Sequence, residues 1–305
     1  MTIATLERFS LSSPLTQLLD TATANGLSNI FNPSITTHRD ATLIAFRAES
    51  FPGERPFRAY LMISTRDSVS LIDLTAASAS VGIPKTADPK LVNLGSSVYV
   101  TFNTGHVHTG QNDIYLQKVF PELAAPQRCA LGHRRDVEKN WGFFIGTDGT
   151  LGALYSLSPL NILRLTTGEL GSDDQLHFEM LTDAPLAKRF PNIHIGSQPI
   201  ILPNGHAIVV ANQQRPIPGL RRKFYFGRLV EVDLAGGSIA QLSPARLIHS
   251  WTSMRPQWRR HNPNLISATY FSGLSVAGDS FILSYGINDK RPGLAHVPID
   301  YAWGA

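Results

Sequence analysis

The 305-residue sequence contains a single cysteine, Cys129, so no disulfide can form within the chain. One thiol is compatible with a reducing compartment, and we expect the protein in the cytoplasm. No run of apolar residues approaches the roughly 18 that a membrane-spanning helix needs. The first residues, MTIATLERFSLSS, have neither the basic start nor the apolar stretch of a secretory signal. We therefore predict no membrane span.

Signature motifs of several enzyme classes are also missing. No GxSxG elbow, P-loop or GxGxxG pattern occurs in a usable context, which disfavours serine hydrolases, NTPases and Rossmann enzymes. The net charge of +4 is weak evidence for a nucleic-acid partner, and no nucleic-acid-binding module is recognisable. His106 and His108 would share one face of a strand, but no third ligand lies nearby in sequence. We expect no metal, no organic cofactor and no nucleic acid.

What the chain does contain is an internal repeat. Several segments share a turn residue, an apolar β-rich run and then small polar or charged residues. They are Thr42–Glu49, Ser97–Gly105, Thr150–Ser158, His206–Gln214 and Ser280–Asp289. Turn-forming pairs such as Asn204-Gly205 come directly before four of them. This pattern predicts one type of β-strand, used repeatedly.

A second shared element, which we call the anchor, lies about ten residues upstream of each segment. It is a polar residue often followed by proline: Asn32-Pro33, Asp88-Pro89, Asn140-Trp141, Gln198-Pro199 and the looser Ser272-Gly273. Successive anchors are 56, 52, 58 and 74 residues apart, about the size of one four-stranded blade. We predict one all-β domain over residues 1–305, a five-bladed β-propeller with blades near 27–75, 86–128, 136–185, 193–245 and 264–300.

Two further features complete the predicted fold. SSPLTQLLDTATANG begins with Ser and Pro and ends with Gly, which predicts a short N-terminal helix. A two-domain β-sandwich protein is the competing interpretation, because strands with turns every 8–12 residues fit it as well. The regular spacing of the anchors favours the propeller, since sandwiches need no fixed period.

In a propeller, the inner strands line one channel and their polar ends converge at one mouth, a common design for small-molecule sites. We therefore expect a single site drawn from distant parts of the sequence. Its predicted carboxylates are Asp88, Glu138 and Asp289. Its predicted substrate-binding residues are Arg47, Lys90, Lys139, Asn140, Trp141, Gln198, Asn212 and Tyr285.

Two of these segments resemble a known family. Asp88-Pro89-Lys90 in ADPKLV, followed by VYVTFNTG, resembles the Glu-Asp-Pro-Arg motif and next strand of glycoside hydrolase family 130. Ser284–Lys290 (SYGINDK) resembles the Tyr-Tyr-Gly-x-x-Asp segment of its last blade. Glu138–Trp141 with ALYSLSPLNILRL resembles a divergent branch of relatives, some associated with polysaccharide biosynthesis.

The resemblance implies a five-bladed propeller and an inverting β-mannoside phosphorylase or hydrolase. It implies that Asp88 stands where the family keeps its catalytic acid and Asp289 where it keeps a sugar-binding carboxylate. Lys90 replaces the usual arginine and Ala87 the usual glutamate. Because lysine lacks the bidentate fork of arginine, the choice between phosphorolysis and hydrolysis stays open.

Inverting glycoside chemistry needs a protonated carboxyl beside the leaving oxygen and a nucleophile on the opposite face of the sugar. The nucleophile is a water held by a second carboxylate roughly 6.5–9.5 Å away, or a phosphate held by cations. The carboxyls could come from Asp88, Glu138 and Asp289, and the cations from Lys90, Lys139 and Arg47. We expect Trp141 to stack on a sugar ring, and Asn140, Gln198 and Asn212 to bind hydroxyl groups. The expected ligand is a saccharide or glycoconjugate, with inorganic phosphate as a candidate co-substrate.

Two other functions fit the same residues. One is a glycosyltransferase whose nucleotide-sugar is held by the basic clusters Arg221–Lys223 and Arg255 with Arg259–His261. The other is a sugar-binding propeller without catalysis. Structural interpretations also exist, because Asp88-Pro89 makes a good turn and Glu138 with Lys139 could be a solvated ion pair. The oligomeric state, the sugar and its linkage are not encoded in any motif found.

Overall fold

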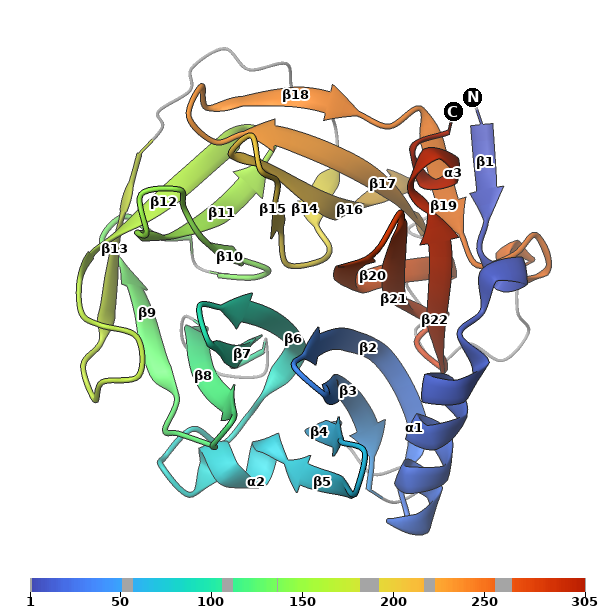
Figure 1. The fold of residues 1–305 in the computed structure, drawn as a ribbon, viewed down its shortest axis with the longest axis horizontal. Coiled ribbons are helices and arrows are strands. Elements are labelled where there is room, and N and C mark those ends of the chain that lie inside the picture. The colour runs from blue at the N-terminus through green and yellow to red at the C-terminus, as the bar shows by residue number, and fades with distance from the viewer. Residues whose placement is uncertain are drawn as a thin grey trace.

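The computed structural model describes residues 2–50, 57–105, 112–135, 137–181, 192–216, 223–255 and 265–304. The protein is predominantly β, as predicted. The described strands can be grouped into runs that are held together mainly by antiparallel pairs, and Figure 1 shows these runs following one another around a common centre.

The first run is β2 (Ser28–His38), β3 (Ala41–Glu49), β4 (Arg58–Ser64) and β5 (Val69–Asp73), and the second is β6 (Ala87–Leu94), β7 (Ser97–Asn103), β8 (Ile114–Phe120) and β9 (Gln127–Leu131). The third run is β10 (Gly142–Ile145), β11 (Leu151–Leu157), β12 (Leu160–Thr167) and β13 (Leu176–Met180). The fourth contains β14 (Ile193–Ile195), β15 (Ile200–Ile201), β16 (His206–Pro216), β17 (Lys223–Asp233), β18 (Ser238–Leu242) and β19 (Ala245–Ile248). The last run is β20 (Leu265–Ala277), β21 (Ser280–Ile287) and β22 (Arg291–Pro298).

Parallel pairs between β9 and β13 and between β17 and β20 link neighbouring runs. The hydrogen-bonded sheets of the described residues therefore contain four, eight and ten strands.

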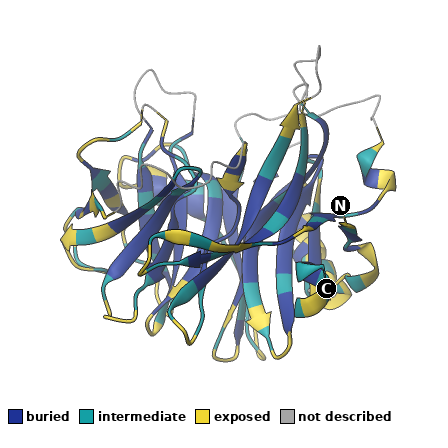
Figure 2. Ribbon diagram, turned by 90° about the horizontal axis from the view of Figure 1, so that it is seen from above, coloured by how far each residue is buried: buried dark blue, intermediate teal, exposed yellow. Residues whose placement is uncertain are grey.

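The repeated apolar segments form the strands β3, β7, β11, β16 and β21. Each of them pairs with a strand on both sides. Four of these strands, β3, β7, β11 and β21, are buried almost throughout, and β16 is buried over residues 207–212. This burial explains their nearly continuous apolar sequence, whereas exposed residues gather at the turns (Figure 2). Gly205 and Gly278 have φ values of 82° and 61°, the left-handed backbone that tight hairpin turns need.

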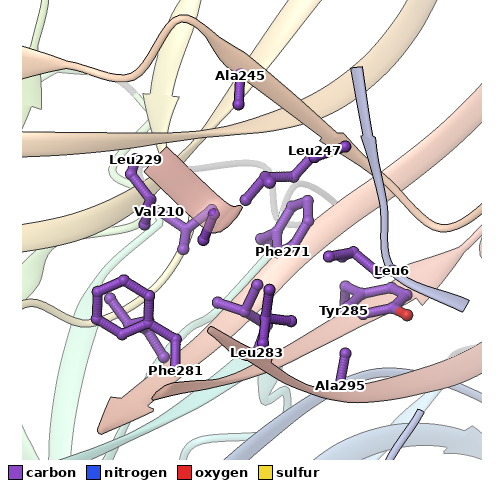
Figure 3. Packing of buried hydrophobic residues seen from close by; sticks show 14 of the residues in the cluster. Leu6, Val210, Leu229, Ala245, Leu247, Phe271, Phe281, Leu283, Tyr285 and Ala295 are labelled. Carbon is purple, nitrogen blue, oxygen red and sulfur yellow. The ribbon is translucent and has the colours of Figure 1, made fainter. Parts of the chain in front are cut away.

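The buried apolar residues fall into clusters that each join two neighbouring runs. Leu43 and Val98 belong to one such cluster between the first and second runs. Figure 3 shows the cluster between the fourth and last runs, where Val210 and Leu229 meet Phe271 and Leu283. A core of this kind lies at every junction, including the one between the last run and the first. Each run is therefore stabilised from both sides.

Side-chain hydrogen bonds to backbone groups also cross each junction. Ser34 Oγ accepts from Leu91 N at 2.9 Å, and Gln198 Oε1 accepts from Phe143 N at 2.7 Å. The corresponding acceptors elsewhere are Asn112 Oδ1 for Glu138 N, Asn212 Oδ1 for Phe271 N and Ser284 Oγ for Ile35 N. These bonds give each of these buried backbone N–H groups an acceptor. A buried N–H group without an acceptor would lower the stability of the fold.

The N-terminal segment lies against the last strands. Its strand β1 (Thr2–Thr5) pairs parallel with β19, and Ser10 bridges Ala295 in β22. The predicted helix is α1 (Ser12–Ala24), which follows the 3-10 turn η1 (Glu7–Phe9). The other helical elements are α2 (Leu74–Ala79), η2 (Thr252–Met254) and α3 (Ile299–Trp303). The two termini thus lie side by side (Figure 1).

Candidate functional site

The site begins with a backbone feature of the anchors. Asn32, Asp88 and Asn140 have φ values of 49°, 50° and 58°, a left-handed conformation that Asn and Asp tolerate better than other side chains do. At the first two, the strand register shifts between Phe31 and Ser34 and between Ala87 and Lys90. Such bulges re-aim a side chain. All three anchor residues line one cavity.

This cavity has a volume of about 560 Å³, within the range of small-molecule sites. Residues from every run line it, among them Arg47 from β3, Tyr155 from β11, Asn212 from β16 and Tyr270 from β20. Of the predicted site residues, those on its wall are Arg47, Asp88, Lys139, Asn140, Asn212 and Asp289. Segments far apart in the sequence therefore meet at one site.

An ion pair lies on the wall of this cavity. Arg47 Nη1 is 3.0 Å from Asp88 Oδ1, and both side chains are only partly exposed. The guanidinium also stacks on Phe31 and Phe57, 5.1 and 5.4 Å from the ring centroids. Burial is the largest single effect on Asp88 and favours its neutral form. Arg47, Lys90 and Lys139 together outweigh burial and lower the pKa of Asp88 below its usual value.

Lysines surround this pair. The Lys90 side chain is 1% exposed, and its Nζ donates to Asn140 Oδ1 at 2.8 Å. Burial lowers the pKa of Lys90 to about 8, although Asp88 opposes the shift. Burial also lowers the pKa values of Lys139 and Lys85, and Arg47 lowers both further. The lysines are thus partly desolvated around a single carboxylate.

Cations outnumber carboxylates in this part of the cavity. Arg135 lies 4.7 Å from the Tyr155 ring centroid. Neither Arg135 nor Lys139 has a carboxylate within 4.0 Å among the described residues. His194 on the same wall has a lowered pKa, because it is buried and because Lys223, Arg135 and Lys139 repel its charged form. The arrangement is suited to an anionic group.

Two tyrosines also line the cavity. The ring centroids of Tyr225 and Tyr270 are 6.4 Å apart, with an angle of 61° between the ring planes. The Tyr270 hydroxyl donates to Asn140 Oδ1 at 3.5 Å. Burial, and then the negative charges of Asp88 and Asp289, raise the pKa of Tyr270 well above its usual value. Tyr270 therefore keeps a neutral hydroxyl in the cavity.

Several predicted site residues lie in the protein interior instead. Trp141 is 1% exposed and packs on Phe143, Tyr155 and Phe178, so no ring face is left for a sugar. Tyr285 is 1% exposed in the cluster between the last two runs, where its hydroxyl contacts His249 Nδ1 at 3.2 Å.

Glu138 and Gln198 have structural contacts. The Glu138 carboxylate accepts from Trp141 Nε1 at 2.9 Å, from the Tyr155 hydroxyl at 2.8 Å and from Arg135 N at 2.8 Å. Gln198 joins Phe143 N to Trp141 O. Both side chains are 3% exposed, so neither reaches a ligand in the cavity. Asn212 reaches the wall, but both its polar atoms already bond the backbone of Phe271.

Some candidates from the sequence lie outside the described residues. These are His106, His108, Arg221, Arg222 and Arg259–His261. In the described ranges, no group of three His, Cys, Asp or Glu side chains could hold a metal ion. No helix within these ranges is long and apolar enough to cross a membrane.

Sequence comparison gives no relatives, since no family model and no curated protein matches the chain. Solved structures do match its fold. One comes from the GH130 family of mannoside phosphorylases, described as containing glycoside hydrolases that target β-1,2 mannosidic linkages in Candida mannan (TM-score 0.62, 14% identity, 98% of this chain and 91% of that chain).

Two others are of related interest. The β-1,2-mannobiose phosphorylase from Listeria innocua has a TM-score of 0.58 at 12% identity and covers 90% of both chains. A GDP-Man-dependent mannosyltransferase from Leishmania mexicana has a TM-score of 0.60 at 14% identity, over 90% of this chain and 86% of that chain. At these identities the likeness concerns the fold, which is related to that of GH130 proteins.

Proposed function

We propose that the chain is a five-bladed β-propeller forming one domain over residues 1–305. The runs of strands around one centre support this, and so do the cores at each junction. Each run then corresponds to one blade of the sequence repeat, and the cavity is the mouth of the central channel. The single cysteine, Cys129, is buried, in keeping with a proposed cytoplasmic location.

We propose further that the protein is a carbohydrate-active enzyme that cleaves or forms a glycosidic bond with inversion, using phosphate as the second substrate. One observation carries the proposal: Asp88, on the wall of the cavity, lies near the cations Arg47, Lys90 and Lys139. The same wall contains Arg135, which has no carboxylate within 4.0 Å among the described residues. Hydrolysis would instead need a carboxylate to hold the attacking water. Glu138 is buried in the wall, which leaves Asp289 as the second carboxylate among the described lining residues.

The cations give Asp88 a role that depends on the ligand. In the free site they keep it ionised, so it cannot act as an acid. A phosphate dianion on Lys139, Arg135 and Arg47 would neutralise the positive field and raise the pKa of Asp88. A phosphate oxygen then attacks the anomeric carbon while the glycosidic C–O bond breaks. The Asp88 proton moves to the leaving oxygen, giving a sugar 1-phosphate and an alcohol, with Asp88 ionised again.

The proposal is tested by incubating the protein with β-1,2-mannobiose, the ligand of the Listeria phosphorylase, with and without phosphate. We expect a sugar 1-phosphate signal in ³¹P NMR that requires both substrates. Asp88→Asn should reduce its formation by at least about a hundredfold, the usual contribution of a general acid. Asp173→Asn, at an exposed loop position, is the matched control. Equal cleavage without phosphate would instead identify a hydrolase.

A nucleotide-sugar-dependent glycosyltransferase is the second candidate. Tyr225 and Tyr270 favour it, because these rings could stack a base while the cations lining the same cavity bind a diphosphate. Thermal stabilisation by GDP-mannose but not by phosphate would support this function over phosphorolysis. If saccharides bind equally to the wild type and Asp88→Asn without any turnover, the protein is a sugar-binding propeller.

A further inference from the structure

A second cavity, of about 340 Å³, lies on the other face of the β16–β17 pair. Side chains alternate between the faces of a strand, so Tyr225 faces the central cavity while its neighbours Phe224 and Phe226 face this one. The same alternation separates Gln214 from Arg215 on β16. The two cavities therefore share two strands but no described lining residue.

The lining of the second cavity is almost entirely apolar. Its apolar walls include Ile3 from β1, Phe224 and Phe226 from β17, Ile248 from β19, and Trp251 and Met254 at η2. Trp251 is 61% exposed, the largest value among the described large apolar residues that are exposed. Covering an exposed indole beside an apolar pocket removes apolar surface from water, which lowers the free energy of the system.

Two arginines are the exceptions in this lining. The Arg246 guanidinium carbon lies 4.7 Å from the Phe226 ring centroid, and Arg215 lies on the neighbouring strand β16. Burial, and then repulsion from Arg215, lower the pKa of Arg246. Burial, and then repulsion from Arg246, also lower the pKa of Arg228. No carboxylate lies within 4.0 Å of these three side chains in the described ranges.

We propose that this pocket binds one amphipathic anion, a long acyl chain that ends in a carboxylate. The acyl chain of the ligand would cover the apolar surfaces of Trp251, Phe224 and Phe226, which a hydrophilic ligand would not stabilise. The carboxylate would pair with Arg246 and Arg215 and supply the negative charge that the described residues lack. The site is separate from the proposed glycosyl transfer, and neither proposal depends on the other.

Dodecanoate is the probe, used below its micelle concentration with the full chain. We expect saturable binding of one molecule per chain by calorimetry, with a blue shift of tryptophan emission as Trp251 loses water. Arg246→Gln and Arg215→Gln should each weaken binding about tenfold, the scale of one charge-assisted hydrogen bond. Arg66→Gln, at an exposed turn position, is the matched control and should bind as the wild type does.

Further comparisons separate the contributions of Trp251, the carboxylate and the acyl chain to binding. Trp251→Phe should abolish the spectral shift, while calorimetry still detects binding, so loss of signal is not confused with loss of the site. Dodecanol tests the charge and acetate tests the chain, and each should bind at least about tenfold more weakly than dodecanoate. Equal affinity for dodecanol, no effect of either arginine variant, or no saturable binding would overturn the proposal. So would concentration-dependent dimerisation that Trp251→Ala prevents, since a second copy would then be the occupant.

Discussion

Asp88 and Arg47 show how opposing electrostatic effects set the state of one residue. Burial favours a neutral Asp88, but three nearby cations favour the carboxylate and prevail. The pair is partly exposed, with 17% of the Arg47 side chain and 21% of the Asp88 side chain accessible, so a ligand can reach it. A ligand that brings its own negative charge would compete with Asp88 for these cations. We therefore expect anion binding to raise the pKa of Asp88 and so to couple its protonation to the ligand.

Lys90 gives a prediction about stability and pH. Its pKa is lowered to about 8 in the folded protein, whereas an unfolded lysine keeps its proton up to about 10.5. Between these pH values the unfolded chain binds more protons, so stability rises with pH. The free energy of unfolding of the wild type should therefore rise relative to Lys90→Met over this window, by on the order of 3 kcal/mol at most.

Urea denaturation at several pH values measures this difference. Lys223→Met replaces an exposed lysine and should follow the wild-type profile. Parallel profiles for the wild type and Lys90→Met would mean that Lys90 is not desolvated as the structure indicates.

At the scale of the strand, the anchors explain which site residues could be predicted from the sequence. The repeat gave Asp88 and Asn140 equivalent positions, and in the structure both have left-handed backbone and line one cavity. It could not assign their neighbours, because Asn140 and Trp141 lie just before β10, where no strand alternation fixes which way a side chain points. Trp141, next to Asn140, lies in the core.

Other residues of the site were missed for a related reason. Tyr270 lies in the sequence ATYFSG, which resembles any buried strand. Its hydrogen-bond partner Asn140 is 130 residues away, so the contact exists only after folding. Glu138 was predicted as a site residue because it lies at the anchor Asn140-Trp141, although with Lys139 it could also have been a solvated ion pair. The buried indole and phenol that it bonds could not be identified without the fold.

The left-handed anchor also gives a prediction. Asn140→Gly and Asn140→Ala both remove the side chain, but glycine adopts a φ of 58° without strain and alanine does not. Asn140→Ala should therefore be less stable than Asn140→Gly by about 1 kcal/mol. Asn93 on β6 is the control, because it has no positive φ. There, Asn93→Gly should be less stable than Asn93→Ala, since glycine is unfavourable within a strand. Thermal and urea unfolding check both pairs, and the same order at both positions would contradict the proposed backbone constraint.

At the scale of the whole molecule, the N-terminal segment connects the two ends of the chain. Leu11 N donates to Leu294 O, and the Tyr301 hydroxyl bonds both Thr5 N and Thr5 O. Leu6 is fully buried in the cluster between the fourth and last runs (Figure 3). Because every run packs on two neighbours, loosening one junction should weaken the whole ring rather than one part of it.

Substitutions at two distant junctions test this cooperativity. Leu6→Ala acts on the junction of the fourth and last runs, and Leu163→Ala acts on that of the second and third, where Leu163 is also fully buried. Each should destabilise the protein by about 2–5 kcal/mol, the usual range for a buried leucine. If the chain is one domain, both variants lower the midpoint of a single calorimetric transition. If it were two domains, each variant would shift a different transition and leave the other at its wild-type temperature. The two variants therefore distinguish a closed propeller from a pair of sandwiches, because only a closed ring makes the two junctions interdependent.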